Sequence, residues 1–98
     1  MAGIEKLARL KQLLLGMERD LGIDDLSAVQ RNIVYAATLL SETSKTVETE
    51  ELRQHELLNG VSRSAFFRAL RELVEAGYLQ HAQGRQRSSY VVSKELGS

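Results

Sequence analysis

The sequence predicts a single, mostly helical α+β domain with an extra helix at its N-terminus. Four stretches have apolar residues at helical spacing, two strand-like runs follow them, and glycines or short polar segments separate these elements. The 98 residues, 43% of them apolar, are enough for one domain with a modest core but not for two. We therefore expect an amphipathic N-terminal helix within residues 1–22 and the body of the domain in residues 23–96.

The first predicted helix runs from Ile4 to Leu21 and stops at Gly22, a residue suited to a left-handed helix end. Its apolar residues alternate three and four positions apart, which is the spacing of a coiled-coil seam. We expect this stripe to join two copies of the chain in a homodimer, because a monomer would leave it in water unless the domain's own core absorbs it. The predicted dimerisation residues are Leu7, Leu10, Leu14, Met17 and Leu21.

The second and third helices have recognisable beginnings. Ser27-Ala28-Val29-Gln30 is a capping box, in which the serine hydroxyl and the glutamine amide each bond a backbone N–H of the other residue. Val47, with Thr46 before it and Thr49 shortly after it, predicts a very short strand, and a third helix is expected from about Thr49 to the break at Asn59-Gly60. The expected buried stripe of the second helix consists of Ile33, Ala36, Ala37 and Leu40.

The fourth predicted helix begins after the N-cap Ser62, runs to Ala76 and is ended by Gly77. At about 100° per residue, one side of this helix is apolar and the opposite arc is polar and rich in arginine. We expect the apolar side to face the core. That side comprises Phe66, Ala69, Leu70, Leu73 and Gly77, and the free arc comprises Ser64, Arg68, Arg71 and Glu75, with Phe67 at its edge and Arg63 in the first turn.

Two strand-like runs, residues 78–83 and 88–93, are joined by Gly84-Arg85-Gln86-Arg87 and predict a β-hairpin. Helix, helix, short strand, helix, helix and hairpin is the element order of a winged helix-turn-helix. The predicted fold class is therefore α+β, mostly helical: a winged helix-turn-helix with an extra N-terminal helix and a wing of two or three strands. The two arginines of the connecting segment, Arg85 and Arg87, should lie at the tip of the wing.

The segment from Val61 to Leu79 resembles the recognition helix of bacterial winged-helix regulators, in particular the multiple-antibiotic-resistance regulator superfamily. The similarity lies in a small polar start, a central arginine and leucine, and a glycine followed by two apolar residues. It extends over residues 27–93 and implies a DNA-binding regulator of transcription. Nine residues separate Leu52 from Ser62, more than in a tight helix-turn-helix, so a longer turn or third helix is expected.

An arginine-bearing helix suits the major groove of double-stranded DNA, because arginine bonds guanine O6 and N7 in pairs and serine hydroxyls reach bases or phosphates. The alternative is a solvated face on which Arg68 and Arg71 pair with Glu72 and Glu75 along the helix. Phe67 has two interpretations, contact with thymine methyl groups or packing under the wing. The candidate DNA-binding residues are Ser62, Arg63, Ser64, Phe67, Arg68 and Arg71 on the helix, and Arg85 and Arg87 on the wing, which would meet the minor groove or backbone.

The formal net charge is zero, which taken alone is unusual for a nucleic-acid-binding domain. The charge is uneven, however: residues 18–56 carry a net −5 and residues 61–94 a net +4, so one end of the molecule can attract a polyanion. The neutral total leaves a second interpretation open, a winged helix used for protein binding in a larger assembly. RNA binding has less support, since the tyrosines are isolated and no arginine-rich tail is present.

Several function classes are not expected. The chain has no cysteine, which excludes disulfides, cysteine-ligated zinc and thiol nucleophiles and fits an intracellular setting. His55 and His81 are far apart, and no arrangement of serine, histidine and acid or glycine-rich phosphate loop is present, so we expect no enzyme, cofactor or metal. No apolar run reaches the roughly 20 residues of a membrane span and no signal-peptide pattern is seen, so a soluble, cytoplasmic protein with no membrane partner is expected.

Overall fold

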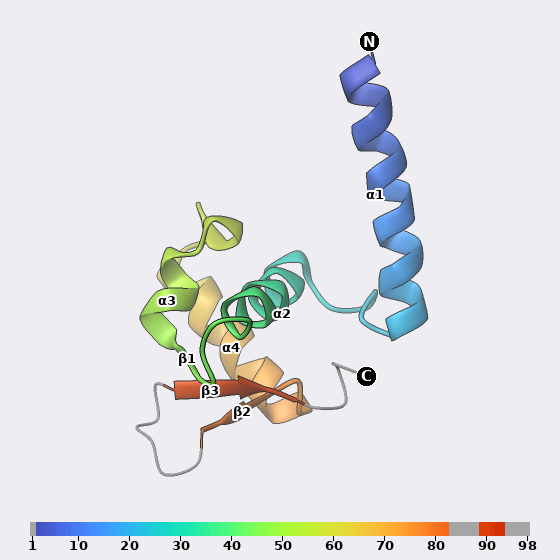
Figure 1. The fold of residues 1–98 in the computed structure, drawn as a ribbon. Coiled ribbons are helices and arrows are strands. Elements are labelled where there is room, and N and C mark those ends of the chain that lie inside the picture. Colours follow the sequence, from blue (N-terminus) through green and yellow to red (C-terminus); the bar gives the residue numbers. More distant parts are fainter. Residues whose placement is uncertain (1, 83–88, 94–98) are drawn as a thin grey trace.

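The computed structural model describes residues 2–82 and 89–93 of the chain. They form a mostly helical α+β fold, a winged helix-turn-helix with an additional N-terminal helix, which confirms the predicted fold class (Figure 1). The elements in chain order are α1 (Ala2–Leu21), α2 (Ala28–Leu40), β1 (Val47–Glu48), α3 (Thr49–Gln54), the 3-10 turn η1 (Glu56–Leu58), α4 (Arg63–Ala76), β2 (Leu79–His81) and β3 (Ser89–Val92).

The core is a single cluster to which every element from α2 to β3 contributes. Ile33 of α2, Leu52 of α3 and Leu73 of α4 are completely buried in it, and Val47 and Leu79 bring in the strands. Such a cluster ties local helices to one another and to the sheet, because each element can hide its apolar face only against the others.

Helix α2 begins as the sequence predicts. The Ser27 hydroxyl accepts a hydrogen bond from the Gln30 backbone N–H at 3.1 Å, and the Gln30 side-chain oxygen accepts one from the Ser27 N–H at 2.8 Å. The expected stripe is buried at Ile33, Ala36 and Ala37, whereas Leu40 is only half-buried against the core; Val34 is also buried, although the spacing did not predict it.

Helix α4 buries the predicted face with one correction. Phe66, Ala69, Leu70 and Leu73 are all in the core, but Gly77 is exposed. Gly77 instead has a left-handed φ of 90° and ends the helix, while the Tyr78 N–H bonds the Leu73 carbonyl oxygen at 2.9 Å. The role of this glycine is therefore conformational, since a side chain is disfavoured at that φ.

The segment between α3 and α4 is longer than a tight turn, as expected, but the third helix is shorter than predicted. Helix α3 ends at Gln54 rather than at Asn59-Gly60, because His55 takes an extended conformation and its Nδ1 accepts a hydrogen bond from the Leu57 N–H at 3.2 Å. The following 3-10 turn buries Leu58 in the core. The extra residues thus form a packed turn of their own.

The sheet has three antiparallel strands in the order β1-β3-β2. Its central strand β3 places Tyr90 opposite both Val47 of β1 and His81 of β2. The hairpin predicted after α4 is therefore confirmed, and β1 extends it to three strands. Gly84, Arg85 and Arg87 of the predicted tip lie outside the described residues.

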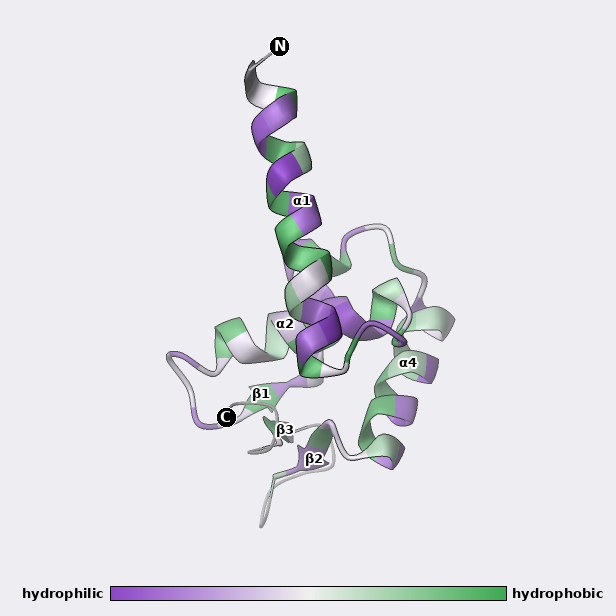
Figure 2. Ribbon diagram, turned by 90° about the vertical axis from the view of Figure 1, so that its right-hand side faces the viewer, coloured by the Kyte–Doolittle hydropathy of each residue, from purple (hydrophilic) through white to green (hydrophobic). Residues whose placement is uncertain are grey.

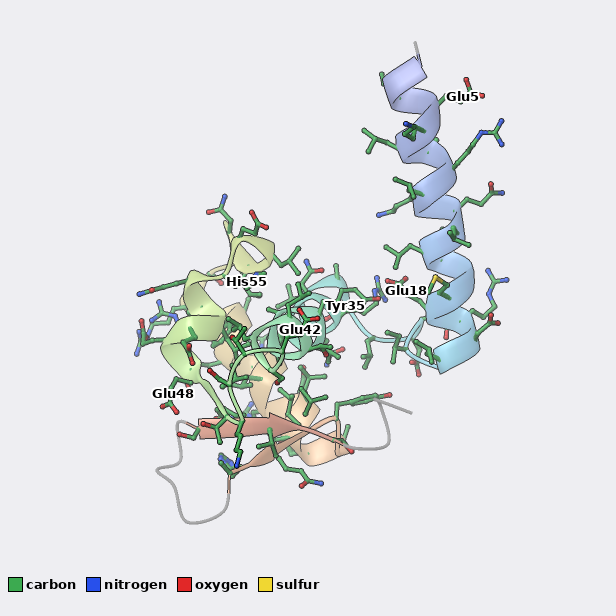
Figure 3. The ribbon with its side chains drawn as sticks, in the orientation of Figure 1. Glu5, Glu18, Tyr35, Glu42, Glu48 and His55 are labelled. Carbon is green, nitrogen blue, oxygen red and sulfur yellow. The ribbon has the colours of Figure 1, made fainter. Side chains whose placement is uncertain are left out.

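Helix α1 projects from the body and leaves it at one joint (Figure 1). The predicted stop is confirmed: Gly22 has a φ of 77°, and the N–H of the buried Ile23 bonds the Glu18 carbonyl oxygen at 3.0 Å. The Glu18 side chain is only 7% exposed despite its charge. Its carboxylate accepts a hydrogen bond from the Tyr35 hydroxyl of α2 at 2.5 Å and lies 3.7 Å from the Arg31 guanidinium (Figure 3).

We predict that Leu70→Ala and Leu73→Ala each lower the free energy of unfolding by about 2 to 5 kcal/mol, because both truncations leave a cavity in the core. Chemical denaturation measures the change. Leu39→Ala is the matched control, since Leu39 is 50% exposed and its truncation leaves no such cavity. Parent-like unfolding of both core variants would show that the buried face of α4 is wrongly assigned.

A second prediction concerns the joint between α1 and α2. Burial, followed by the hydrogen bond to Glu18 and its negative charge, raises the pKa of Tyr35 from 10.0 to about 12. Since folding favours the protonated phenol, its stabilising contribution is complete below pH 10 and is lost as the pH rises to about 12. Unfolding curves for the parent and Tyr35→Phe should therefore differ at neutral pH and converge over that interval. Tyr78→Phe is the control. If the stability difference between the parent and Tyr35→Phe stayed constant from pH 10 to pH 12, the raised pKa of Tyr35 would be wrong.

Candidate nucleic-acid interface

The outer face of α4 carries the side chains that the sequence predicts to contact DNA. Arg63, Ser64, Arg68 and Arg71 are all exposed on this helix. Ser62, also exposed, is its N-cap, and its hydroxyl accepts a hydrogen bond from the Ala65 N–H at 3.2 Å. The cap and the buried opposite face hold the helix in place, so its arginines extend from a fixed support.

The arginines of α4 differ in their partners. Arg71 lies 3.7 Å from Glu75, but both side chains are at least 70% exposed, and a pair so exposed contributes little. Arg68 forms no ion pair with any described residue. Glu72 accepts a hydrogen bond from the Gln30 side chain of α2 at 3.1 Å instead. Pairing with a glutamate of the same helix, which the alternative interpretation expected for both arginines, is thus observed for Arg71 but not, among the described residues, for Arg68.

Phe67 is 37% exposed at the edge of this face and makes three ring contacts. Its ring meets that of the buried Phe66 edge to face, with centroids 5.1 Å apart. The guanidinium carbons of Arg63 and of Arg53 lie 5.1 and 5.8 Å from its centroid. Arg53, on α3, was not among the predicted residues, because no sequence spacing relates it to α4.

A groove of about 350 Å³ runs beside this face, between α4 and the sheet. Phe67, Arg71 and Glu75 line it from the helix, and His81 and Tyr90, whose ring centroids are 4.9 Å apart, line it from the strands. Phe67 thus lines the same groove as the strand residues, while 37% of its surface stays open to solvent, so the two interpretations of this residue both remain open.

The two histidines have separate places in the fold. His55 begins the 3-10 turn and is half-buried, and His81 packs on Tyr90 in the sheet. Within residues 2–82 and 89–93, no three His, Asp or Glu side chains are grouped in a way that would hold a metal ion. No helix in that part of the chain is long and apolar enough to cross a membrane.

Helix α1 presents a second candidate surface. All five predicted seam residues are exposed, from 39% at Leu14 to 66% at Leu7, and Figure 2 shows apolar positions along the length of the projecting helix. Ile4, Leu13 and Leu15 are exposed beside them. An apolar stripe of this extent on an isolated helix is the mark of an association surface.

Comparison with known proteins finds no matching family, no similar curated protein and no similar solved structure. The candidate nucleic-acid interface is therefore supported only by the sequence and structure of this chain. Of the predicted DNA-binding residues, five are exposed on α4 and Ser62 caps that helix, whereas Arg85 and Arg87 lie outside the described residues.

Proposed function

We propose that this protein binds double-stranded DNA sequence-specifically, as a homodimer, and regulates transcription by binding rather than by catalysis. The observation that carries the proposal is the outer face of α4, where arginines extend from a helix whose other face is locked in the core. The second helix of a helix-turn-helix enters the major groove with its N-terminal residues toward the base edges.

Arg68 is the strongest candidate for a base contact. It lies in the second turn of α4, it is exposed, and no described carboxylate holds it in place. Arg71 must exchange its exposed contact with Glu75 for one with DNA, which costs little because the pair is solvated. Arg63 and Ser64, in the first turn, are placed for bases or phosphates.

The apolar stripe of α1 supports the homodimer. Two copies joined through this stripe would bring their recognition helices into a two-fold arrangement, which matches inverted half-sites about 10 base pairs apart. Together with the resemblance of residues 61–79 to bacterial winged-helix regulators, this supports a place in the multiple-antibiotic-resistance regulator superfamily.

Protein binding through the same face is the second candidate function. The observation that favours it is the groove between α4 and the sheet, where Phe67 is part-exposed and Arg71 and Glu75 supply both signs of charge. DNA binding explains more, because it also accounts for Arg68, which has no ion-pair partner among the described residues, and for the positive net charge of residues 61–94.

We predict that Arg68→Ala or Arg71→Ala weakens binding to the preferred duplex by about 1 to 3 kcal/mol and relaxes specificity at one position. Arg85→Ala and Arg87→Ala should weaken all sequences alike and lower the salt slope by about one unit per lost phosphate contact. Fluorescence anisotropy with duplexes selected from a random pool, and with scrambled ones, measures both effects.

Arg9→Ala is the control for these variants, because Arg9 is an exposed arginine of α1 that pairs with Glu5, away from α4. It should bind DNA like the parent. If the parent shows no salt-sensitive binding to any duplex at low ionic strength, DNA binding is wrong and protein binding replaces it.

We predict that the protein sediments at about twice its 11.0 kDa mass and that Leu14→Lys shifts it toward monomer, because a charge in the seam cannot be buried between two helices. Circular dichroism should show that most helix remains. Gln12→Lys adds the same charge to α1 at an exposed position outside the predicted seam and should leave the dimer intact. A parent that sediments as a monomer would contradict the dimer.

A further inference from the structure

We propose that Arg53 of α3 is an additional contact to the DNA backbone, and that Phe67 positions Arg53 and Arg63 together at its ring as one phosphate-binding pair. The proposal rests on the proposed DNA-binding function and extends it to α3. It also gives Phe67 a role that differs from thymine contact and from packing alone.

The geometry of the Phe67 ring supports this role. The edge-to-face contact with Phe66, which is 2% exposed, anchors the ring to the core. Both guanidinium groups lie within the range of about 6 Å over which an aromatic ring attracts a cation. One anchored ring therefore brings together two cations that come from different helices.

The charges at this ring are incompletely balanced. Arg53 is paired with Glu50 at 2.8 Å, whereas Arg63 forms no ion pair with any described residue. Two like charges near one ring repel each other, and the ring and a single carboxylate offset that repulsion only in part. A phosphate would complete the balance, since its oxygens match the paired N–H groups of a guanidinium.

The position of the pair in the fold points to the DNA backbone in particular. Arg63 is the first residue of α4, and Arg53 is in the last turn of α3, the preceding helix of the helix-turn-helix. While the recognition helix occupies the major groove, the helix before it crosses the backbone. A pair shared by both helices at this point would meet phosphates at the edge of the groove.

Glu50 then acts as a competitor of DNA for Arg53. Its side chain is 64% exposed and that of Arg53 is 29% exposed, so the pair is accessible and is only partly shielded from water. Binding of a phosphate to Arg53 would displace this carboxylate. Removing the charge of Glu50 should therefore strengthen DNA binding.

The test is fluorescence anisotropy over a salt series, using the parent's best selected duplex and a scrambled one. Arg53→Gln should weaken both duplexes by a similar factor and lower the salt slope by about one unit. Phe67→Leu should weaken both roughly two- to fivefold, Phe67→Tyr should bind like the parent because it keeps the ring, and Glu50→Gln should bind more tightly. Arg9→Gln, which also loses an arginine paired with a nearby glutamate, is the control and should have no effect.

Each alternative has its own signature. If the parent binds with salt dependence but Arg53→Gln behaves like Arg9→Gln, the Arg53 contact is overturned and DNA binding stands. If Phe67→Leu changes preference at one base pair while the salt slope is unchanged, Phe67 contacts a thymine methyl group instead. Should Phe67→Leu fail to fold, the surface variants of Arg53 and Glu50 decide the matter. A parent that binds no duplex overturns both the proposed function and this extension.

Discussion

The fold depends on the burial of one face of α4. Phe66, Ala69, Leu70 and Leu73 hide their side chains in the one core cluster to which α2, the 3-10 turn and the strands also contribute. Because a helix is a rigid rod, fixing its inner face also fixes the direction in which each Cα–Cβ bond of its outer face points. The same packing that stabilises the domain thus determines how its arginines are presented.

The elements and the buried faces were predictable because they depend on local patterns. The capping box at Ser27, the glycine stops at Gly22 and Gly77 and the apolar face of α4 each depend on residues within a few positions of one another. The end of α3 was not predictable in the same way. Nothing in the sequence around His55 indicates a helix end. Only the hydrogen bond that its side chain accepts from the Leu57 N–H shows why the helix stops before it.

The unpredicted parts of the candidate site come from contacts between distant residues. Arg53 meets Phe67 only because α3 packs beside α4, and Glu72 turns to Gln30 of α2 rather than to an arginine of its own helix. The buried position of Glu18 is a further case, since an acidic residue in a helix with exposed leucines gives no sign that Tyr35 and Arg31 will surround it. A linear pattern identifies the face of a helix but not the partner that occupies it.

The polar joint at Glu18 has a mechanical consequence. The molecule measures 50 × 29 × 25 Å, and most of its length comes from a helix attached to the body at one end (Figure 1). A small rotation of such a helix at its attached end therefore produces a large displacement of its free end. The Tyr35 hydroxyl and the Arg31 guanidinium contact Glu18 from α2 and so restrain that rotation. In a homodimer joined through α1, these few polar contacts would therefore determine the distance between the two proposed DNA-binding domains.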